Sequence, residues 1–300
     1  MAIAREIKPD AVYSCQQQWD CKAATYLARK LDVPQIIHLH YIIGPWLHQP
    51  ILDRLKTCEH VITVSDFIRD MVLEHGVAAD RATSVINTMS VPALRSPSER
   101  EATRRAFGVP DGAPLIGIVA RLDPSKGQAD TLHAFVEVLK LAPEARLLIV
   151  GSEMSGNPGY TDELKSLSSS LGLDNRAVFL GRRDDVPRIM GALDVFVHPT
   201  RLDPCPLSVL EASAAGVPVV AYAEGGANEM VATGVTGLLT EPGNVTQLAQ
   251  SLLHLVRNPA EARSMGASGR ERVGKLFQPG DAGLAFTNLV TRVASEPVRR

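Results

Sequence analysis

Short apolar runs alternate with longer amphipathic stretches along most of this chain. In the first third, the apolar runs lie at residues 10–15, 35–41, 60–65 and 82–87. The stretches between them place apolar residues at helical spacing, most regularly at 65–75. Runs that are apolar on both faces and separated by helices predict a parallel β-sheet covered by helices.

The second half repeats this alternation more strongly. Strands are predicted at residues 114–121, 145–151, 177–181, 195–199, 218–222 and 236–240. Helices are predicted between them and, after the last strand, at 244–257, 259–277 and 281–295. Residues 91–114, rich in Pro, Ser, Arg and Glu, form the predicted connection, with one short helical pattern at 100–107. The sequence therefore predicts an α/β protein with two doubly wound, Rossmann-like domains, whose ligands bind outside the carboxyl ends of the strands.

Length and charge narrow the possible functions. A chain of 300 residues exceeds what one compact core usually holds, which favours two domains. The formal net charge of −2 argues against nucleic acid as a main partner. No apolar run is long enough to cross a bilayer, and residues 1–10 lack the apolar core of a signal peptide. We therefore expect a cytoplasmic protein, and a peripheral position at a membrane stays open.

Cysteine, histidine and acidic residues show no metal-ligand spacing. The cysteines lie far apart, so we expect reduced thiols rather than a disulfide framework: Cys15, Cys21, Cys58 and Cys205. No cluster of Asp and His has the spacing of a metal site. We therefore expect no metal and no separate cofactor.

The segment RLDPSKGQ carries two cations between a predicted strand and a helix. Arg121 leaves the strand, and Lys126 and Gly127 open the helix. Two cations beside the partial positive charge of a helix N-terminus repel it unless an anion is present, which indicates a phosphate site. The alternative for this pair alone is that both are ordinary surface cations.

The segment LDPCPLSVLEASAAGVPVV places a glutamate inside a helix of small apolar residues. Pro206 suits the start of a helix. Ser208 and Glu211 share an outward face, where the carboxylate could accept hydrogen bonds from the two hydroxyls of a ribose or hexose. For Glu211 taken alone, the favoured interpretation is that it caps or decorates an exposed helix face. The face expected to pack on the sheet carries Leu207, Leu210 and Ala214.

Taken together, these loops resemble a known family. RLDPSKG, VFVHPTRLDPCPLSVLEASAAGVPVVAYAEGGANEMV and GVTGLLTEPGN are similar to the donor-binding domain of the retaining glycosyltransferases of family 4, also called glycosyl transferases group 1. The resemblance covers about residues 114–277 and implies the GT-B fold, in which two doubly wound domains face each other. We place an acceptor-side domain with its linker at 1–108, the donor-binding domain at 109–280, and at 281–300 a helix that packs back toward the first domain.

The resemblance implies roles for individual residues. The family has two glutamates separated by seven residues, and Asp203 and Glu211 occupy these positions. The first would lie by the donor sugar as a catalytic residue, and the second would bind the nucleotide ribose. Arg121 and Lys126 match the basic pair that holds the diphosphate, with Gly127 beside them.

The resemblance also implies how the donor is held and cleaved. The backbone amides of Leu207 and Ser208 would complete the anion site, and Arg182, in LGRRDDV, would lie beside the base. Glu229 receives no role, because a helix-terminal acid that bonds local N–H groups is an equally good interpretation. The implied substrate is a nucleotide-diphosphate sugar, such as a UDP- or GDP-sugar, whose transfer retains anomeric configuration without a metal. The cations stabilise the leaving diphosphate.

The match is thinner in the first half. LDVPQIIHLHYIIGP resembles the family strand that ends in a histidine near the donor sugar, and His40 fits best. His38 lies two residues earlier and shares its face, so it stays an alternative. Trp19 and Trp46 follow strands and could stack on an acceptor, but core packing is the expected fate of both.

Three departures from the family pattern bear on activity. Asp203 is one methylene shorter than the family glutamate, so its reach falls by about 1.5 Å. Pro204 and Pro206 stand where glycines are common and remove an N–H. The opening strands of the first domain are missing, because MAIAREIKPDAVYS resembles a later part. Either the natural start lies upstream, or an exposed sheet edge is completed by a homodimer or a partner chain.

These observations favour one function and leave alternatives. The favoured function is a glycosyltransferase that moves a hexose to a carbohydrate, lipid-linked or small-molecule acceptor. The alternatives are a protein that binds a nucleotide sugar without transferring it, and an epimerase or hydrolase of the same architecture. A Rossmann oxidoreductase is disfavoured, because no strand is followed by G-x-G-x-x-G.

Overall fold

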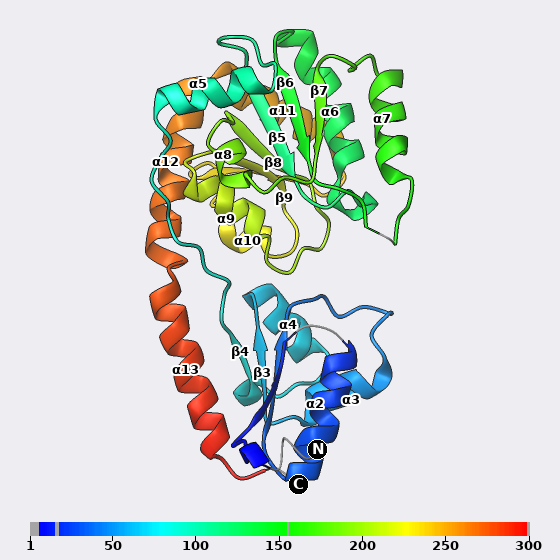
Figure 1. The fold of residues 1–300 in the computed structure, drawn as a ribbon, viewed down its shortest axis with the longest axis vertical. Coiled ribbons are helices and arrows are strands. Elements are labelled where there is room, and N and C mark those ends of the chain that lie inside the picture. Colours follow the sequence, from blue (N-terminus) through cyan, green and yellow to red (C-terminus); the bar gives the residue numbers. More distant parts are fainter. Residues whose placement is uncertain (1–5, 16–17, 155, 299–300) are drawn as a thin grey trace. The chain divides into compact units, whose positions relative to one another are not determined.

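The computed structural model describes residues 6–15, 18–154 and 156–298, drawn as a ribbon in Figure 1. They fall into two compact units. Unit 1 holds the described residues of 1–88 and 279–300 together with 203–205, and unit 2 holds those of 89–202 and 206–278. Each unit has its own β-sheet.

Unit 1 is a four-stranded parallel sheet in the order β1-β2-β3-β4. Its strands are β1 (Val12–Ser14), β2 (Gln35–Leu39), β3 (His60–Thr63) and β4 (Ala82–Ser84). Its helices are α2 (Gln18–Leu31), α3 (Gln49–Thr57), α4 (Asp66–Glu74), the short 3₁₀ helix η1 (Ala79–Arg81) and α13 (Pro279–Ser295). Ser65 caps α4 by accepting a hydrogen bond from the backbone N–H of Ile68, so the predicted helix at 65–75 begins one residue after its cap.

The C-terminal helix α13 packs on the sheet of unit 1. Its Leu289 and Val293 form a buried cluster with Ile36 of β2 and Ile62 of β3. Phe286 of α13 meets the Tyr13 ring edge-on, with 5.7 Å between ring centroids. The last described helix of the chain thus completes the core of the first unit.

Unit 2 is a six-stranded parallel sheet in the order β10-β9-β8-β5-β6-β7. Its strands are β5 (Leu115–Val119), β6 (Arg146–Val150), β7 (Ala177–Gly181), β8 (Val195–His198), β9 (Val219–Tyr222) and β10 (Gly237–Thr240). Its helices are α5 (Pro97–Ala106), the 3₁₀ helix η2 (Pro124–Lys126), α6 (Gln128–Leu141), α7 (Tyr160–Ser170), α8 (Val186–Met190), α9 (Leu207–Ala214), α10 (Ala227–Met230), α11 (Val245–Arg257) and α12 (Pro259–Leu276). The predicted fold class, α/β with two Rossmann-like domains built on parallel sheets, is confirmed, and in the described residues the strand order reverses in the sheet of unit 2 but not in that of unit 1.

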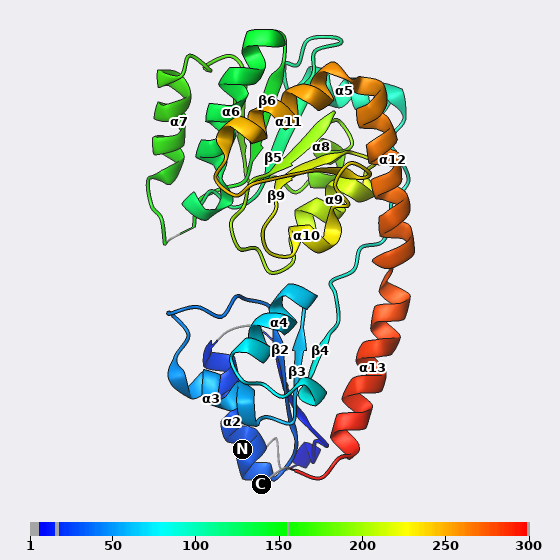
Figure 2. The same ribbon diagram turned by 180° about the vertical axis from the view of Figure 1, so that it is seen from behind.

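An extensive core lies between the sheet of unit 2 and helices α6 and α11, which run side by side in Figure 2. Ile149 of β6 and Val195 of β8 are buried there against Phe135 of α6 and Leu252 of α11. Each such side chain contributes roughly 1.5 to 3 kcal/mol when fully buried. This core fixes the strand ends from which the candidate site loops leave.

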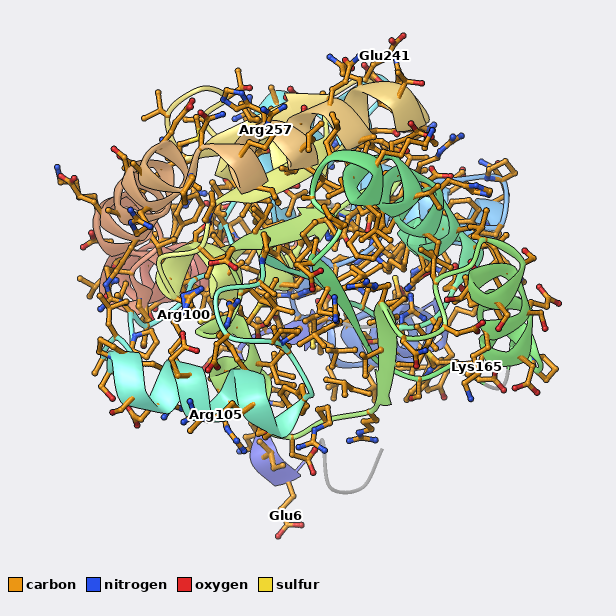
Figure 3. The ribbon with its side chains drawn as sticks, turned by 90° about the horizontal axis from the view of Figure 1, so that it is seen from above. Glu6, Arg100, Arg105, Lys165, Glu241 and Arg257 are labelled. Carbon is orange, nitrogen blue, oxygen red and sulfur yellow. The ribbon has the colours of Figure 1, made fainter. Side chains whose placement is uncertain are left out.

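Helix α5 ties the connecting segment to unit 2. Ser96 and Glu99 form a capping box at its start. Arg104, only 4% exposed, donates to Asp194 Oδ2 over 3.1 Å, and the same oxygen accepts from the Leu115 backbone N–H at 2.7 Å. Arg100, labelled on α5 in Figure 3, pairs with the other oxygen of Asp194. The predicted connection therefore contributes a helix to the second sheet.

The described residues contain neither a helix that could span a membrane nor a cluster of metal-ligating side chains. None of the helices found there is long and apolar enough to span a bilayer. No group of three or more His, Cys, Asp or Glu residues in the described ranges could hold a metal ion. The four cysteines all lie within those ranges, and none of them is in a disulfide there.

Candidate functional site

The loop that joins β5 to α6, residues 120–127, is shaped by an aspartate. Asp123 Oδ1 accepts from the Ser125 backbone N–H at 2.9 Å, and Oδ2 accepts from Asn157 Nδ2 at 2.7 Å. The hydrogen bond from the Ser125 hydroxyl, followed by weaker contributions, holds the pKa of Asp123 below its usual range. Asp123 is thus committed to the turn that leads into Lys126.

The predicted basic pair of the phosphate site and Gly127 lie in this β5–α6 loop. Arg121 is exposed, with Nη1 3.0 Å from the sulfur of Met154, and Lys126 is half-buried. Gly127 adopts φ +71°, a left-handed conformation that L side chains disfavour. Because it also precedes α6, the loop delivers two cations to a helix N-terminus, where an anion is stabilised.

The β5–α6 loop touches the loop between β8 and α9, residues 199–206. The backbone N–H of Arg201 donates to the Ser125 carbonyl oxygen at 3.1 Å. A Cβ added to Gly127 would overlap the carbonyl oxygen of Pro199, so glycine permits this approach. The sheet order explains the contact, because β5 and β8 are neighbours.

Helix α9 begins at Leu207, directly after Pro206. Helix geometry leaves the backbone N–H groups of Leu207 and Ser208 without intrahelical acceptors, as an anion site requires. Leu210 and Ala214 are buried as predicted, but Leu207 is 46% exposed. The prediction that Leu207 packs on the sheet is wrong. Leu207 is the first residue of α9, and the buried part of the helix begins only at Val209.

Glu211 lies one turn into α9 and is half-buried. Burial raises its pKa, because the carboxylate loses hydration. A buried carboxylate is stabilised by hydrogen-bond donors. Two neighbouring hydroxyls of a bound sugar are such donors, so Glu211 can select a diol.

Two further predicted site residues, Arg182 and Asp203, lie in the loops that follow β7 and β8. Arg182 is exposed after β7, whereas its neighbour Arg183 makes two hydrogen bonds to Asp185, at 2.8 and 2.9 Å. Asp203 lies in the β8–α9 loop, where Oδ1 accepts from the Cys205 backbone N–H at 3.2 Å. Of the two neighbouring arginines, Arg183 is held by Asp185, and Arg182 is therefore the one that can turn to a ligand.

The two candidate histidines lie at the carboxyl end of β2 in unit 1. Their rings are neighbours, with centroids 4.2 Å apart. His38 is 9% exposed, and its Nδ1 lies 2.7 Å from the Tyr13 hydroxyl. Burial, together with the charge of His40, lowers the pKa of His38 to about 4. Burial also lowers the pKa of His40, which keeps solvent contact. His40 is thus the accessible member of the pair and His38 its buried support.

The two tryptophans do not enter the core. Trp19 on α2 is 66% exposed, and Trp46 in the loop after β2 is 57% exposed. The prediction of core packing is wrong. More than half of the surface of each residue stays exposed, which the spacing of apolar residues along the chain cannot reveal.

The structure thus brings the predicted donor residues to one edge of one sheet. Arg121, Lys126 and Gly127 follow β5, Arg182 follows β7, and α9 follows β8. Sequence reasoning missed Gln128, a fully buried residue whose Nε2 donates to the Arg121 carbonyl oxygen at 2.6 Å. No periodic signal marks it, because it stands at the first position of a helix, where glutamine is ordinarily solvated.

Family models match both parts of the chain. The model described as "Glycosyl transferases group 1" matches residues 99–272, and that for "Glycosyltransferase Family 4" matches residues 1–88.

Curated relatives are glycosyltransferases. The GDP-mannose-dependent monoacylated alpha-(1-6)-phosphatidylinositol monomannoside mannosyltransferase of Corynebacterium glutamicum is 36% identical over 211 residues, which are 67% of this chain and 52% of that protein. The 2-deoxystreptamine glucosyltransferase of Streptomyces kanamyceticus is 29% identical over 281 residues, 87% of this chain and 71% of that protein. The chain therefore spans about half the length of the mannosyltransferase.

Among solved structures, HepE from Anabaena in complex with UDP is similar over 97% of this chain and 80% of its own. The TM-score is 0.89 and the sequence identity 26%. This likeness agrees with the predicted pair of Rossmann-like domains.

Proposed function

The chain belongs to the glycosyl transferases group 1 family, and we propose that it transfers a hexose from a nucleotide-diphosphate sugar to an acceptor hydroxyl. Retention of anomeric configuration and independence from metal ions are part of this proposal. The observation that carries it is the contact between the β5–α6 loop, which holds Arg121 and Lys126, and the β8–α9 loop, which leads into α9, at one edge of the sheet.

The charges at this junction suit a leaving diphosphate. Cleavage of the bond between sugar and diphosphate builds positive charge on the anomeric carbon and negative charge on the phosphate oxygens. Arg121, Lys126 and the N–H groups that open α9 would stabilise the negative charge in place, as fixed donors do in other transition states. Glu211 would accept hydrogen bonds from the ribose, and Arg182 would lie near the base.

Relatives support the donor class. HepE has been crystallised with UDP and with UDP-glucose, and the corynebacterial relative uses GDP-mannose. We propose a UDP- or GDP-hexose as donor and a carbohydrate, lipid-linked or small-molecule acceptor. His40 and Asp203 are the residues proposed beside the donor sugar.

The test combines binding with turnover. Thermal stabilisation by UDP, GDP, ADP and TDP, each measured with EDTA, identifies the base and tests metal independence. Turnover of the matching labelled sugar nucleotide is then compared between the wild type and Arg121→Ala, and the anomeric configuration of the product is read by NMR. Stabilisation by none of the nucleotides would refute the proposal.

A second candidate, binding without transfer, is favoured by one observation. Asp203 is shorter than the family glutamate, and its Oδ1 already bonds the Cys205 backbone. Nucleotide binding with no turnover of any donor would select this candidate. Product analysis separates an epimerase or hydrolase, whose product lacks a new glycosidic bond.

Assembly and location are proposals as well. Strand β1 has β2 as its neighbour in the described sheet and forms an edge, so we propose that a second copy or a partner chain pairs with it. Light scattering that finds a monomer at all concentrations would contradict this. We propose a reducing, cytoplasmic location, which the four cysteines fit because none of them is in a disulfide in the described residues.

A further inference from the structure

The chain has two tryptophans, and both present their rings to solvent at the same end of unit 1. Trp19 stands in the first turn of α2, which follows β1, and Trp46 stands in the loop between β2 and α3, residues 40–48. Because β1 and β2 are parallel neighbours, their carboxyl ends meet at one sheet edge. That edge is where α/β proteins bind ligands.

Contacts join the two elements that carry the rings. Lys22 stands one turn after Trp19, and His48 stands two residues after Trp46. The distance from Lys22 Nζ to His48 Nδ1 is 3.4 Å. The phenol of Tyr41 lies near the charges of the first turns of α2: burial raises its pKa, and Cys21 and Asp20 add to the shift. The β2–α3 loop therefore runs along the N-terminal half of α2.

The Trp46 ring is held by the backbone beneath it. A Cβ on Gly44 would overlap three carbons of the Trp46 ring, so the indole lies against the glycine. The Leu47 N–H donates to the Gly44 carbonyl oxygen at 2.9 Å and closes the turn. An aromatic ring held in this way loses little conformational freedom when a ligand stacks on it.

The loop that carries Trp46 begins with His40, a residue proposed beside the donor sugar. We propose that Trp19 and Trp46 bind the acceptor, and that the acceptor presents a saccharide or cyclitol ring. The apolar face of the ring stacks on an indole, while its hydroxyls bond polar groups around it, such as Lys22 and His48. This inference rests on the proposed function and names the substrate class of the acceptor side.

The surroundings favour a sugar ring over a lipid chain. A lipid chain requires an enclosed apolar channel, whereas charged or polar residues flank the tryptophans along the chain: Asp20 and Lys22 after Trp19, and His48 and Gln49 after Trp46. A rigid aromatic surface bordered by a few hydrogen-bonding groups is the pattern of a site that orients a polar ligand.

Intrinsic fluorescence tests the inference directly, because every tryptophan of the chain lies in this site. The probes are the methyl α- and β-glycosides of glucose, mannose and galactose, and myo-inositol, titrated into the full chain. At least one is expected to change the emission saturably. Trp46→Ala and Trp19→Ala are expected to weaken its binding about 5- to 10-fold each, as loss of an aromatic contact predicts.

Three outcomes separate this inference from the proposed function. With the donor identified, Trp46→Ala should raise the acceptor KM and leave kcat and nucleotide stabilisation near wild type, a split that a structural role would not produce. If nucleotides stabilise the chain but no sugar or cyclitol alters the emission, the inference is refuted while the proposed function stands. A blue shift with anionic phospholipid vesicles and none with sugars would also overturn it, in favour of a membrane-facing surface.

Discussion

Gln128 donates from Nε2 to the carbonyl oxygen of Arg121 over 2.6 Å, and it is fully buried. It is the first residue of α6, so the hydrogen bond links the start of a helix to the point where β5 ends. The side-chain amide of Gln128 therefore fixes the backbone that carries the Arg121 side chain. A buried carbonyl oxygen without such a donor is costly, because it loses its hydration without compensation.

Replacement of this amide should affect both stability and donor binding. Gln128→Leu leaves the Arg121 carbonyl without its donor, and we expect a loss of about 1 to 3 kcal/mol in the free energy of unfolding. Nucleotide affinity should fall as well, because Arg121 is no longer held in place. Denaturant unfolding and nucleotide titration measure the two effects. Gln250→Leu, at an exposed position of α11, is the control and should change neither.

Loss of the charge of Lys126 should lower the affinity for the donor nucleotide and have no other effect. In Lys126→Ala the proposed phosphate contact is lost, which corresponds to about 1.5 to 3 kcal/mol for a charged hydrogen bond. We therefore expect nucleotide diphosphates to bind roughly 10- to 150-fold more weakly by calorimetry. Lys165→Ala, on the exposed helix α7 in Figure 3, removes an equal charge and should leave affinity unchanged. Equal affinity of both variants would contradict the phosphate role.

The carboxylate of Glu211 should lower the free energy of unfolding at neutral pH, although it contributes to binding of the donor nucleotide. Its pKa is raised in the folded state, so the folded chain holds this proton to higher pH than the unfolded chain does. The stabilisation is present below the ordinary pKa of glutamate, about 4.3, and is lost as pH rises through the folded value. Glu211→Gln should therefore be more stable than wild type at neutral pH, and the difference should vanish toward pH 4.

Thermal unfolding between pH 4 and 8 measures this effect, with Glu163→Gln on an exposed face of α7 as the control. Nucleoside diphosphate affinity should fall in Glu211→Gln, because an amide accepts fewer hydrogen bonds from a diol than a carboxylate does. A variant that is less stable than wild type at pH 8 would show that Glu211 has a structural partner instead.

His38 should make unit 1 sensitive to acid. Its pKa is lowered from 6.5 to about 4 in the folded chain. Between these two pH values, His38 is therefore protonated in the unfolded chain and neutral in the folded chain. Stability is full above pH 6.5 and falls as pH drops, by up to about 1.36 kcal/mol per pH unit for one such group. His38→Asn, which cannot be protonated, should show a flatter decline between pH 6.5 and 4.

Tryptophan fluorescence is the appropriate readout, because both tryptophans lie in unit 1 and report its unfolding. His75→Asn, at the exposed end of α4, is the control and should follow the wild type. Parallel curves for His38→Asn and wild type would place the acid sensitivity elsewhere.

The elements of both sheets could be predicted because their signal is local. Alternation of apolar runs marks each strand, and Ser65 and Pro206 mark helix starts within one residue. A pattern along one element reports which of its faces is buried. It therefore suffices for a parallel sheet whose two faces are both covered.

What could not be predicted depends on neighbours that are distant in the sequence. The exposure of Trp46 is set by how far α2 and α4 cover the β2–α3 loop, and Arg104 and Asp194 pair across 90 positions. Likewise, the hydrogen bond from Gln128 exists because the β5–α6 loop folds back over the helix start. Such pairings leave no period in the sequence.

Asp203 offers a test of the shortened acid itself. Its Oδ1 accepts from the Cys205 backbone at 3.2 Å, so the carboxylate is held close to its own loop. Asp203→Glu extends the side chain by about 1.5 Å, which would restore the reach of the family glutamate toward the donor sugar. We expect several-fold faster turnover with unchanged nucleotide affinity, whereas Asp203→Asn should be slower than wild type. If Asp203→Glu instead slows turnover as far as Asp203→Asn does, the shorter acid is matched to the donor sugar of this chain, and its role differs from that of the family residue.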